Sequence, residues 1–145
     1  MLQYLLQILI GLLGGVAASL QAPFAGIMGQ KVGDLGSVFF TYGGGALLVG
    51  LIVFLSGGGT LANWRDIPWY AYAAGPLGLV IIGSISYTVP RLGASTSTTL
   101  FVIAWLVVSA FVDQFGWFGL EIRPLNPTRL AGIAALLVGT WLVVK

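Results

Sequence analysis

The sequence contains no cysteine and no histidine, and charged residues make up only 7% of it. Without cysteine the chain can form no disulfide and offers no thiolate. Without histidine it lacks the commonest general base and metal ligand. Its acidic residues are scattered along the chain: Asp34, Asp66, Asp113 and Glu121. Because acid–base and metal chemistry need titratable groups that converge, the sequence predicts no catalytic residue, no metal site and no enzyme.

Binding of phosphate and of nucleic acid is also disfavoured. The glycine runs 43–45 and 57–59 are followed by no lysine and lack a strand–helix context. They therefore do not form a phosphate-binding loop, and we predict no cofactor. The net charge of +2 comes from isolated Lys and Arg residues. Since a basic patch is missing, nucleic acid is not an expected partner.

Apolar residues are abundant: they make up 58% of the chain, and the mean hydropathy is +1.01. Soluble domains carry about 25% charged residues, so we predict an all-α integral membrane protein. Charges, prolines and glycine clusters divide the sequence into five apolar stretches of membrane-spanning length. The predicted spans are residues 2–29, 35–55, 68–89, 94–115 and 128–144, in one transmembrane domain of residues 1–145.

Short turns are predicted at residues 31–34 and 90–93, where glycine, charge and proline interrupt the apolar pattern. In the second turn Pro90 is expected to end the preceding helix. The first apolar stretch could instead be a signal peptide that is cleaved off. It lacks the basic segment that such peptides carry and is longer than their apolar region, so we expect a membrane span.

Small residues recur every fourth position along the first span, at Gly14, Ala18, Ala22 and Gly26. Small side chains at this spacing let helix backbones approach closely, which favours association in lipid. The pattern predicts a tightly packed helical bundle and carries no information about a substrate.

The same span holds residues poorly suited to lipid. Pro23 lacks an N–H and clashes with the carbonyl of Ser19, so a kink is expected there. The backbone groups that the kink frees need partners from neighbouring helices or water, which suggests a cavity at membrane depth. Gln21 lies at this bend and could bind a polar or zwitterionic ligand. An amide that joins two helices is the alternative.

Other candidate substrate-binding residues are Ser19 and Pro23 at the bend, Ser86 and Tyr87 on the third span, and Trp105 on the fourth. The hydroxyls could instead bond to carbonyls one turn earlier. Trp105 could form an aromatic wall or could pack in the core or against lipid. Pro23 and Pro76 are candidate hinges, because proline weakens the helix hydrogen-bond ladder.

Positive charges are balanced between the two predicted sides of the membrane. One side receives Arg65, Arg123 and Arg129, and the other receives Lys31, Arg91 and Lys145. Because the Lys/Arg bias orients membrane proteins, a chain without bias has no strong preference. We therefore expect copies to insert both ways and to pair as an antiparallel homodimer. A fixed orientation, or a partner protein of opposite bias, is the alternative.

Four segments of the sequence carry a family resemblance. They are Gln21-Ala22-Pro23, Pro90-Arg91-Leu92-Gly93-Ala94, Asp113-Gln114-Phe115-Gly116-Trp117-Phe118-Gly119 and Pro124-Leu125-Asn126-Pro127-Thr128-Arg129. In this order they resemble the half-size, five-helix YdcZ-like branch of the drug/metabolite transporter superfamily, over essentially the whole chain. The resemblance implies a ten-helix inverted-repeat transporter made of two oppositely oriented units. It also implies a cavity mainly between the first, third and fourth helices. The family often has Gly-Gln where this chain has Ala104-Trp105.

The acidic residues bear on how transport would be coupled. The first span has no acid, whereas small cationic-drug antiporters of that superfamily depend on a carboxylate there. Asp113 is the one acid within a predicted span and lies close to the membrane edge. We expect it to act as an interfacial cap or as the partner of an arginine such as Arg129, rather than to relay protons.

We therefore predict a small-molecule transporter of the bacterial inner membrane, in contact with lipid, that works by alternating access on neutral or zwitterionic metabolites. The alternative is a non-transporting membrane subunit that needs an oppositely oriented paralogous partner.

Overall fold

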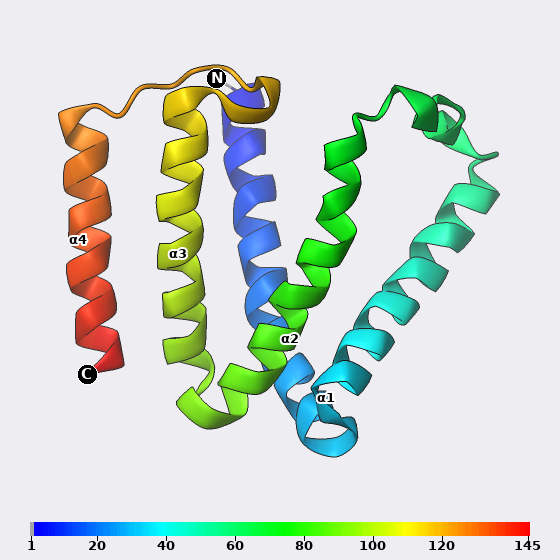
Figure 1. The fold of residues 1–145 in the computed structure, drawn as a ribbon, viewed down its shortest axis with the longest axis horizontal. Helices are drawn as coiled ribbons and strands as arrows, with labels where there is room; N and C mark the ends of the chain where they lie inside the picture. The colour runs from blue at the N-terminus through cyan, green and yellow to red at the C-terminus, as the bar shows by residue number, and fades with distance from the viewer. Residues whose placement is uncertain (1) are drawn as a thin grey trace. The chain divides into compact units, whose positions relative to one another are not determined.

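A computed structural model describes residues 2–145, apart from the side chains of residues 59, 60 and 62. This part of the chain is helical and contains no strand, which confirms the predicted all-α class. The long helices are α1 (Leu2–Leu55), α2 (Ala74–Leu92), α3 (Ala94–Phe115) and α4 (Pro127–Val144) (Figure 1). The short 3-10 helices are η1 (Gly59–Asp66), η2 (Trp69–Ala73) and η3 (Trp117–Gly119).

The chain divides into two compact units, Met1–Arg91 and Leu92–Lys145. The first unit contains α1, η1, η2 and nearly all of α2. The second contains α3, η3 and α4. The sequence predicts a single domain over residues 1–145, of which residue 1 lies outside the described residues.

Within residues 2–145, four helices are long and apolar enough to cross a membrane: Leu2–Leu55, Trp69–Leu92, Ala94–Phe115 and Pro127–Val144. The last two coincide with the predicted spans 94–115 and 128–144 to within a residue. The first two predicted spans, 2–29 and 35–55, are joined in α1. The only residue of α1 outside helical conformation is Gly33, so the predicted turn at residues 31–34 is narrower than expected.

Gly33 separates α1 into two helical segments that run in different directions (Figure 1). Its φ of 79° and ψ of 163° are nearly restricted to glycine, because a Cβ would clash with the backbone. One such residue reverses the chain without a loop, which leaves few backbone groups without partners. Asp34 follows at the start of the second segment, where the helix dipole favours a negative charge.

The bounds of α2 differ from the predicted span 68–89. Residues Trp69–Ala73 form η2, and the α-helix begins at Ala74. The prediction that Pro90 ends the helix is wrong, because α2 continues through it to Leu92. The fixed φ of proline suits a helix, and near the helix end a single lost backbone hydrogen bond is tolerated. The break falls at Gly93, with φ 82° and ψ 157°.

The helical segments of the first unit converge at the end that carries Gly33. A Cβ on Gly26 would lie 2.9 Å from Val89 Cγ1, and a Cβ on Gly29 would collide with Ser86 Oγ. Farther from Gly33, other glycines of α1 have open space where a Cβ would lie: Gly11, Gly14, Gly15, Gly43, Gly44, Gly45 and Gly50. The small-residue ridge of the first predicted span is therefore packed only in its C-terminal half.

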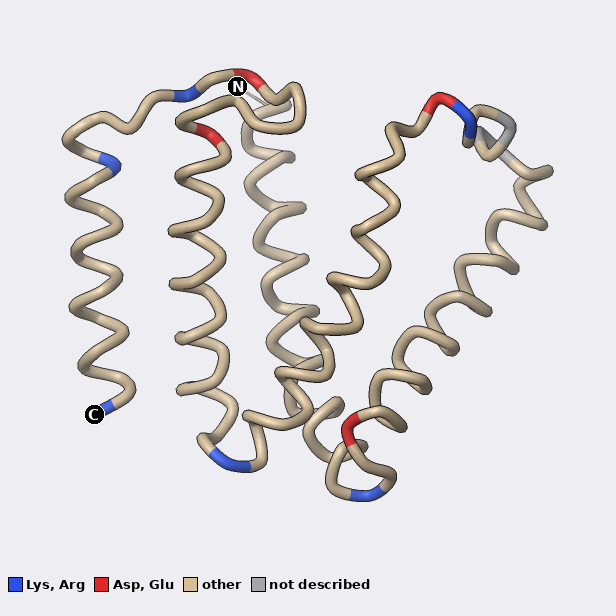
Figure 2. Tube along the Cα trace, viewed as in Figure 1, with Lys and Arg blue, Asp and Glu red and all other residues tan. Residues whose placement is uncertain are grey.

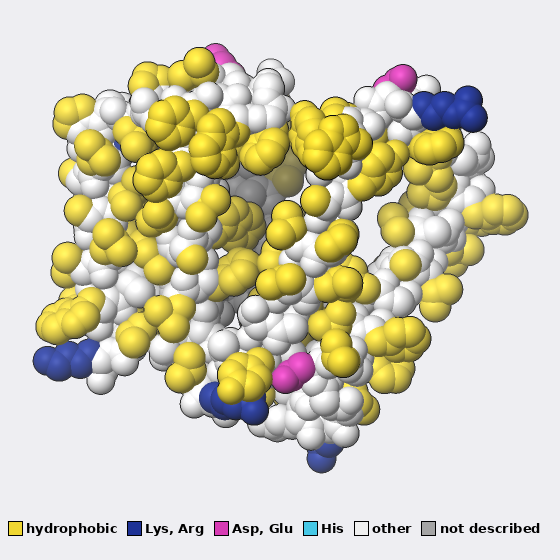
Figure 3. Space-filling view, viewed as in Figure 1, with side chains coloured by type: hydrophobic (Ala, Val, Ile, Leu, Met, Phe, Trp, Pro, Cys, Tyr) yellow, Lys and Arg dark blue, Asp and Glu magenta, His cyan; other side chains and the backbone are white. Residues whose placement is uncertain are grey.

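The chain buries little apolar surface within itself. The buried hydrophobic residues among those described are Ala22, Ala25, Ile82 and Ala110. Large apolar side chains cover much of the visible face (Figure 3). In water such a surface would favour aggregation, whereas in a bilayer it contacts lipid tails or other helices.

The backbone role of Gly33 can be tested by comparison with Gly43. A Cβ meets nothing within 4 Å at either position, so a clash with a neighbour cannot explain a difference. Gly33→Ala should lower the free energy of unfolding by about 1–3 kcal/mol, because its backbone conformation excludes a side chain. Gly43→Ala, in regular helix, should be neutral or stabilising by about 0.5–1 kcal/mol. Unfolding in detergent measures both, and equal midpoints for the two variants would contradict the assignment.

Candidate functional site

A polar contact joins α1 to α2 in the first unit. The hydroxyl of Ser86 donates a hydrogen bond of 2.8 Å to Asp34 Oδ1. Ser86 is 1% exposed and Asp34 is half-buried. Gly29 packs against Ser86, where a larger residue would not fit. Ser86, a predicted substrate-binding residue, therefore uses its hydroxyl to hold two helices together.

A second buried contact links the two segments of α1. Ser37 donates to the carbonyl oxygen of Ala25 over 2.9 Å, and both residues are fully buried. Farther along the second segment, Thr41 Oγ1 is buried and has no hydrogen-bond partner within the described residues. A buried hydroxyl without a partner destabilises a fold by about 1–3 kcal/mol.

The other predicted site residues of the first unit do not gather around Ser86. Ser19 and Gln21 are exposed, and the Ser19 hydroxyl bonds to the Gly15 carbonyl over 2.9 Å. Tyr87 is exposed, and the Arg91 guanidinium lies 3.6 Å from its ring centroid. Within residues 2–145 the side-chain amide of Gln21 forms no hydrogen bond. The role of these residues in binding stays a prediction.

Trp105 in the second unit is 63% exposed, and its ring meets Phe101 edge to face at 5.7 Å between centroids.

The two predicted hinge residues differ in their helical context. Pro23 lies inside α1, but the non-helical residue of that helix is Gly33. Pro76 lies in the first turn of α2, where proline is well tolerated. The placement of Pro23 and Pro76 does not show whether the helices bend there during transport, so both hinge roles stay predictions.

Hydrogen bonds of the second unit fix the loop between α3 and α4, and we call the residues involved the clasp: Asp113, Gln114, Arg123, Leu125, Asn126 and Arg129. The Arg123 amide donates to the Asp113 carbonyl over 2.8 Å, and the Leu125 amide donates to Gln114 Oε1 over 2.6 Å. Asn126 caps α4 by accepting from the Arg129 amide at 2.8 Å. The loop therefore returns to the end of α3 before α4 begins.

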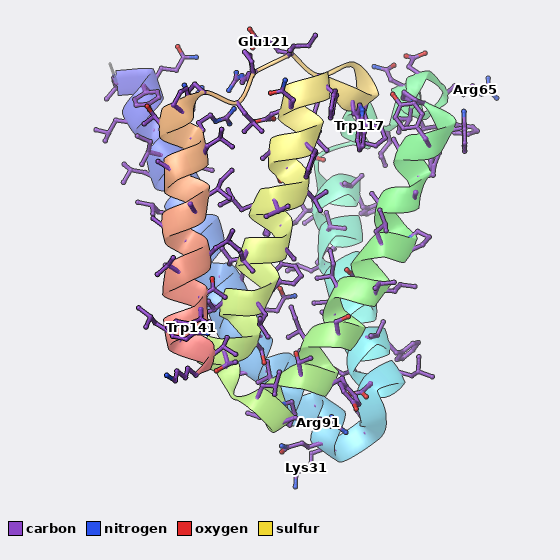
Figure 4. The ribbon with its side chains drawn as sticks, turned by 60° about the vertical axis from the view of Figure 1, so that its left-hand side comes forward. Lys31, Arg65, Arg91, Trp117, Glu121 and Trp141 are labelled. Carbon is purple, nitrogen blue, oxygen red and sulfur yellow. The ribbon has the colours of Figure 1, made fainter. Side chains whose placement is uncertain are left out.

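An ion pair completes the clasp. Arg129 Nη2 lies 2.7 Å from Asp113 Oδ2, and Nη1 donates to the Arg123 carbonyl over 3.1 Å. The expected pairing of Asp113 with Arg129 is thus confirmed. Glu121 and Arg123 form a second pair at 3.1 Å, on the exposed side of the loop. Figure 4 shows Glu121 on this loop and Trp141 near the other end of α4.

A cleft of about 230 Å³ lies between α3 and α4, beside the clasp. Its walls are mainly apolar, and its polar groups are Ser109, Asp113 and Arg129. The sequence analysis identified the ion pair but not the cleft. The sequence carries only a weak signal for the cleft, because α3 and α4 are largely apolar on all sides and their hydropathy does not indicate which faces meet.

One further contact in the structure is not indicated by the sequence. The bond between Asp34 and Ser86 joins residues far apart in the sequence, and no local pattern indicates it. The alternative given for hydroxyls, a bond to the carbonyl one turn earlier, is found for Ser19 and Thr99, whereas Ser86 bonds to Asp34 instead. In the part of the chain that the structure describes, no three His, Cys, Asp or Glu residues come together as metal ligands.

The bond between Ser86 and Asp34 can be tested by a double-mutant cycle. Ser86→Ala should lower the free energy of unfolding by about 1.5–3 kcal/mol, because a half-buried carboxylate loses its hydrogen-bond donor. Ser84→Ala is the control, since Ser84 is exposed on the same helix and its change should stay within about 0.5 kcal/mol. The effects of Ser86→Ala and Asp34→Ala should be non-additive, measured by unfolding in detergent. Strict additivity would show that the two residues do not interact.

The family of the chain follows from a comparison with known proteins. The family model described as "Putative inner membrane exporter, YdcZ" matches residues 6–142. No curated protein and no solved structure matches the chain. The match covers almost the whole sequence, and the helices of membrane-spanning length agree with it. The chain is therefore a multi-pass integral protein of the inner membrane and belongs to the YdcZ family of drug/metabolite transporters.

Proposed function

We propose that this protein is one half of a small-molecule transporter, and that two copies of opposite orientation complete it. The observation that carries the proposal is the near absence of an interior in the single chain. Among the residues whose side chains the structure describes, the buried hydrophobic ones are Ala22, Ala25, Ile82 and Ala110, and three of these are alanines. A path for a polar solute needs walls that exclude lipid, and this chain alone supplies few of them.

The proposal includes five membrane crossings, two of them made by α1. At 1.5 Å per residue, 54 residues of continuous helix would be about 81 Å long, whereas the hydrocarbon core is about 30 Å thick. The reversal at Gly33 supports two crossings instead. An odd number of crossings leaves the two termini on opposite sides of the membrane.

The distribution of positive charge supports dual orientation. In the first unit, Lys31 and Arg91 lie at one end and Arg65 at the other (Figure 4). In the second unit, Arg123 lies in the loop before α4, Arg129 lies in the first turn of α4, and Lys145 follows the last residue of that helix. Figure 2 shows the Lys and Arg residues in blue along the chain. Each unit therefore carries cations at both ends. With no Lys/Arg bias to set the orientation, both orientations should be populated.

Neutral or zwitterionic metabolites are the substrates that fit this chain best. The first segment of α1 offers the amide of Gln21 and no carboxylate. The Asp113 carboxylate is already paired with Arg129 at 2.7 Å, so it is engaged within the chain rather than free for a cationic drug. The family points to transport rather than to enzyme chemistry. Alternating access would move the two copies against each other, with Pro23 and Pro76 as the hinges.

The alternative function is a membrane subunit that does not transport by itself and needs a paralogous partner. The exposed helix faces of this chain could contact either partner. Flux by the purified chain alone separates the two functions, because a subunit of this kind would be silent.

Orientation can be measured by cysteine labelling, since the chain has no cysteine of its own. A single Glu121→Cys variant should react with an impermeant maleimide from both sides of the membrane, because Glu121 is exposed on the α3–α4 loop. Two lysines added after Lys145 should shift the population so that this end stays in the cytoplasm. Two added glutamines are the matched control and should leave the distribution unchanged. Labelling from one side only, with and without the lysines, would contradict dual orientation.

The transport proposal predicts saturable uptake of a neutral or zwitterionic metabolite by proteoliposomes that contain this chain alone. Gln21→Leu should abolish the uptake while the dimer persists, because the variant loses both a donor and an acceptor. Gln7→Leu is the control, since Gln7 is an exposed amide on the same helix. Uptake that is unchanged in Gln21→Leu would remove Gln21 from the site. Silence of the wild-type chain across a metabolite panel would favour the subunit.

A further inference from the structure

The cleft between α3 and α4 runs inward from the clasp, along the two helices. On α3 it extends from Asp113 to Leu106, and on α4 from Arg129 to Leu136. Each stretch spans about 10 Å at the rise of an α-helix. Gly132 leaves room in one wall, because a Cβ there would meet nothing within 4 Å. The cleft is thus an elongated, mainly apolar groove that runs along the two helices.

The mouth of the cleft lies at the boundary between hydrocarbon and headgroups. α3 has 22 residues and α4 has 18, so their lengths of about 33 and 27 Å match a hydrocarbon core of about 30 Å. Asp113 is close to the end of α3, and Arg129 is in the first turn of α4. Both charged groups are therefore at the level where lipid headgroups begin.

The ion pair leaves charged atoms available at this mouth. Arg129 donates from Nη2 to Asp113 and from Nη1 to the Arg123 carbonyl, and its other N–H groups have no partner among the described residues. Asp113 Oδ1 also accepts no hydrogen bond there. The side chains are 42% and 31% exposed, so both can reach a ligand. A guanidinium suits a phosphate, and a carboxylate suits an ammonium group.

We propose that this cleft binds one phospholipid with a zwitterionic, primary-amine headgroup of the phosphatidylethanolamine type. Its phosphate contacts Arg129, its ammonium contacts Asp113, and the upper part of one acyl chain fills the cleft as far as Leu106 and Leu136. The charge pattern selects this lipid class, because an anionic headgroup leaves Asp113 unmatched and adds repulsion. Binding needs only the second unit, so it does not depend on transport or on dimer orientation.

The test is lipid retention by the purified full-length chain, measured by native mass spectrometry. The chain is exchanged into detergent with equal amounts of phosphatidylethanolamine, phosphatidylcholine and phosphatidylglycerol. Phosphatidylethanolamine should be retained most strongly. Gly132→Leu should weaken its retention about tenfold, because the added side chain fills the cleft and leaves the ion pair intact. Gly139→Leu is the matched control, a glycine on the same helix with open space beside it that is not part of the cleft.

The headgroup contact is tested by Arg129→Gln, which should weaken retention about tenfold through loss of a charge-assisted bond. Arg123→Gln is its control, because the Arg123 side chain pairs with Glu121 outside the cleft. Equal retention of all three lipids, or retention that Gly132→Leu does not change, would overturn the proposal. Stronger retention of phosphatidylglycerol would overturn the zwitterionic class. A Gly132→Leu variant that changes only the dimer fraction would assign the cleft to a second copy instead.

Discussion

The hydrocarbon core of the bilayer supplies no hydrogen-bond partner, and this constraint governs the architecture of the chain. Nearly every backbone group of the apolar segments is placed in a helix, and changes of direction must use few residues. At Gly33 and at Gly93 a single glycine with positive φ interrupts the helices. The longer connections, at η1 and η2 and between α3 and α4, carry the charged residues Arg65, Asp66, Glu121 and Arg123.

Polar side chains follow the same constraint. Hydroxyl side chains within helices either bond to the carbonyl one turn earlier, as Thr99 does, or form a hydrogen bond to another helix, as Ser86 does with Asp34. The shorter of the two ion pairs among the described residues, between Asp113 and Arg129, closes the loop at the end of α3. The polar groups of one copy are therefore used mainly for its own structure. The proposed solute pathway would draw on the faces that a single chain leaves open, such as the glycine-rich N-terminal part of α1.

Open faces have two kinds of partner in a membrane, namely protein and lipid. Small residues without side-chain neighbours favour close contact with another helix, and this supports a second copy against α1. A cleft with an ion pair at its mouth and apolar walls favours a lipid, and this distinguishes the α3–α4 cleft. The proposed transporter would then meet its partner copy and its bound lipid at different surfaces.

The sequence by itself determined the all-α membrane class, the family, the extent of α3 and α4, and the pairing of Asp113 with Arg129. These follow from hydropathy, from ordered motifs and from charges placed near helix ends, all of which are local. Only the tertiary structure decided that Gly33 alone reverses α1, that α2 passes through Pro90, and that Ser86 faces Asp34 while Gln21 faces outward. The physical reason is that helices apolar on every side carry no periodic signal for which face packs. The packed face of each helix is then set by contacts between residues far apart in the sequence, and a single sequence does not reveal these contacts.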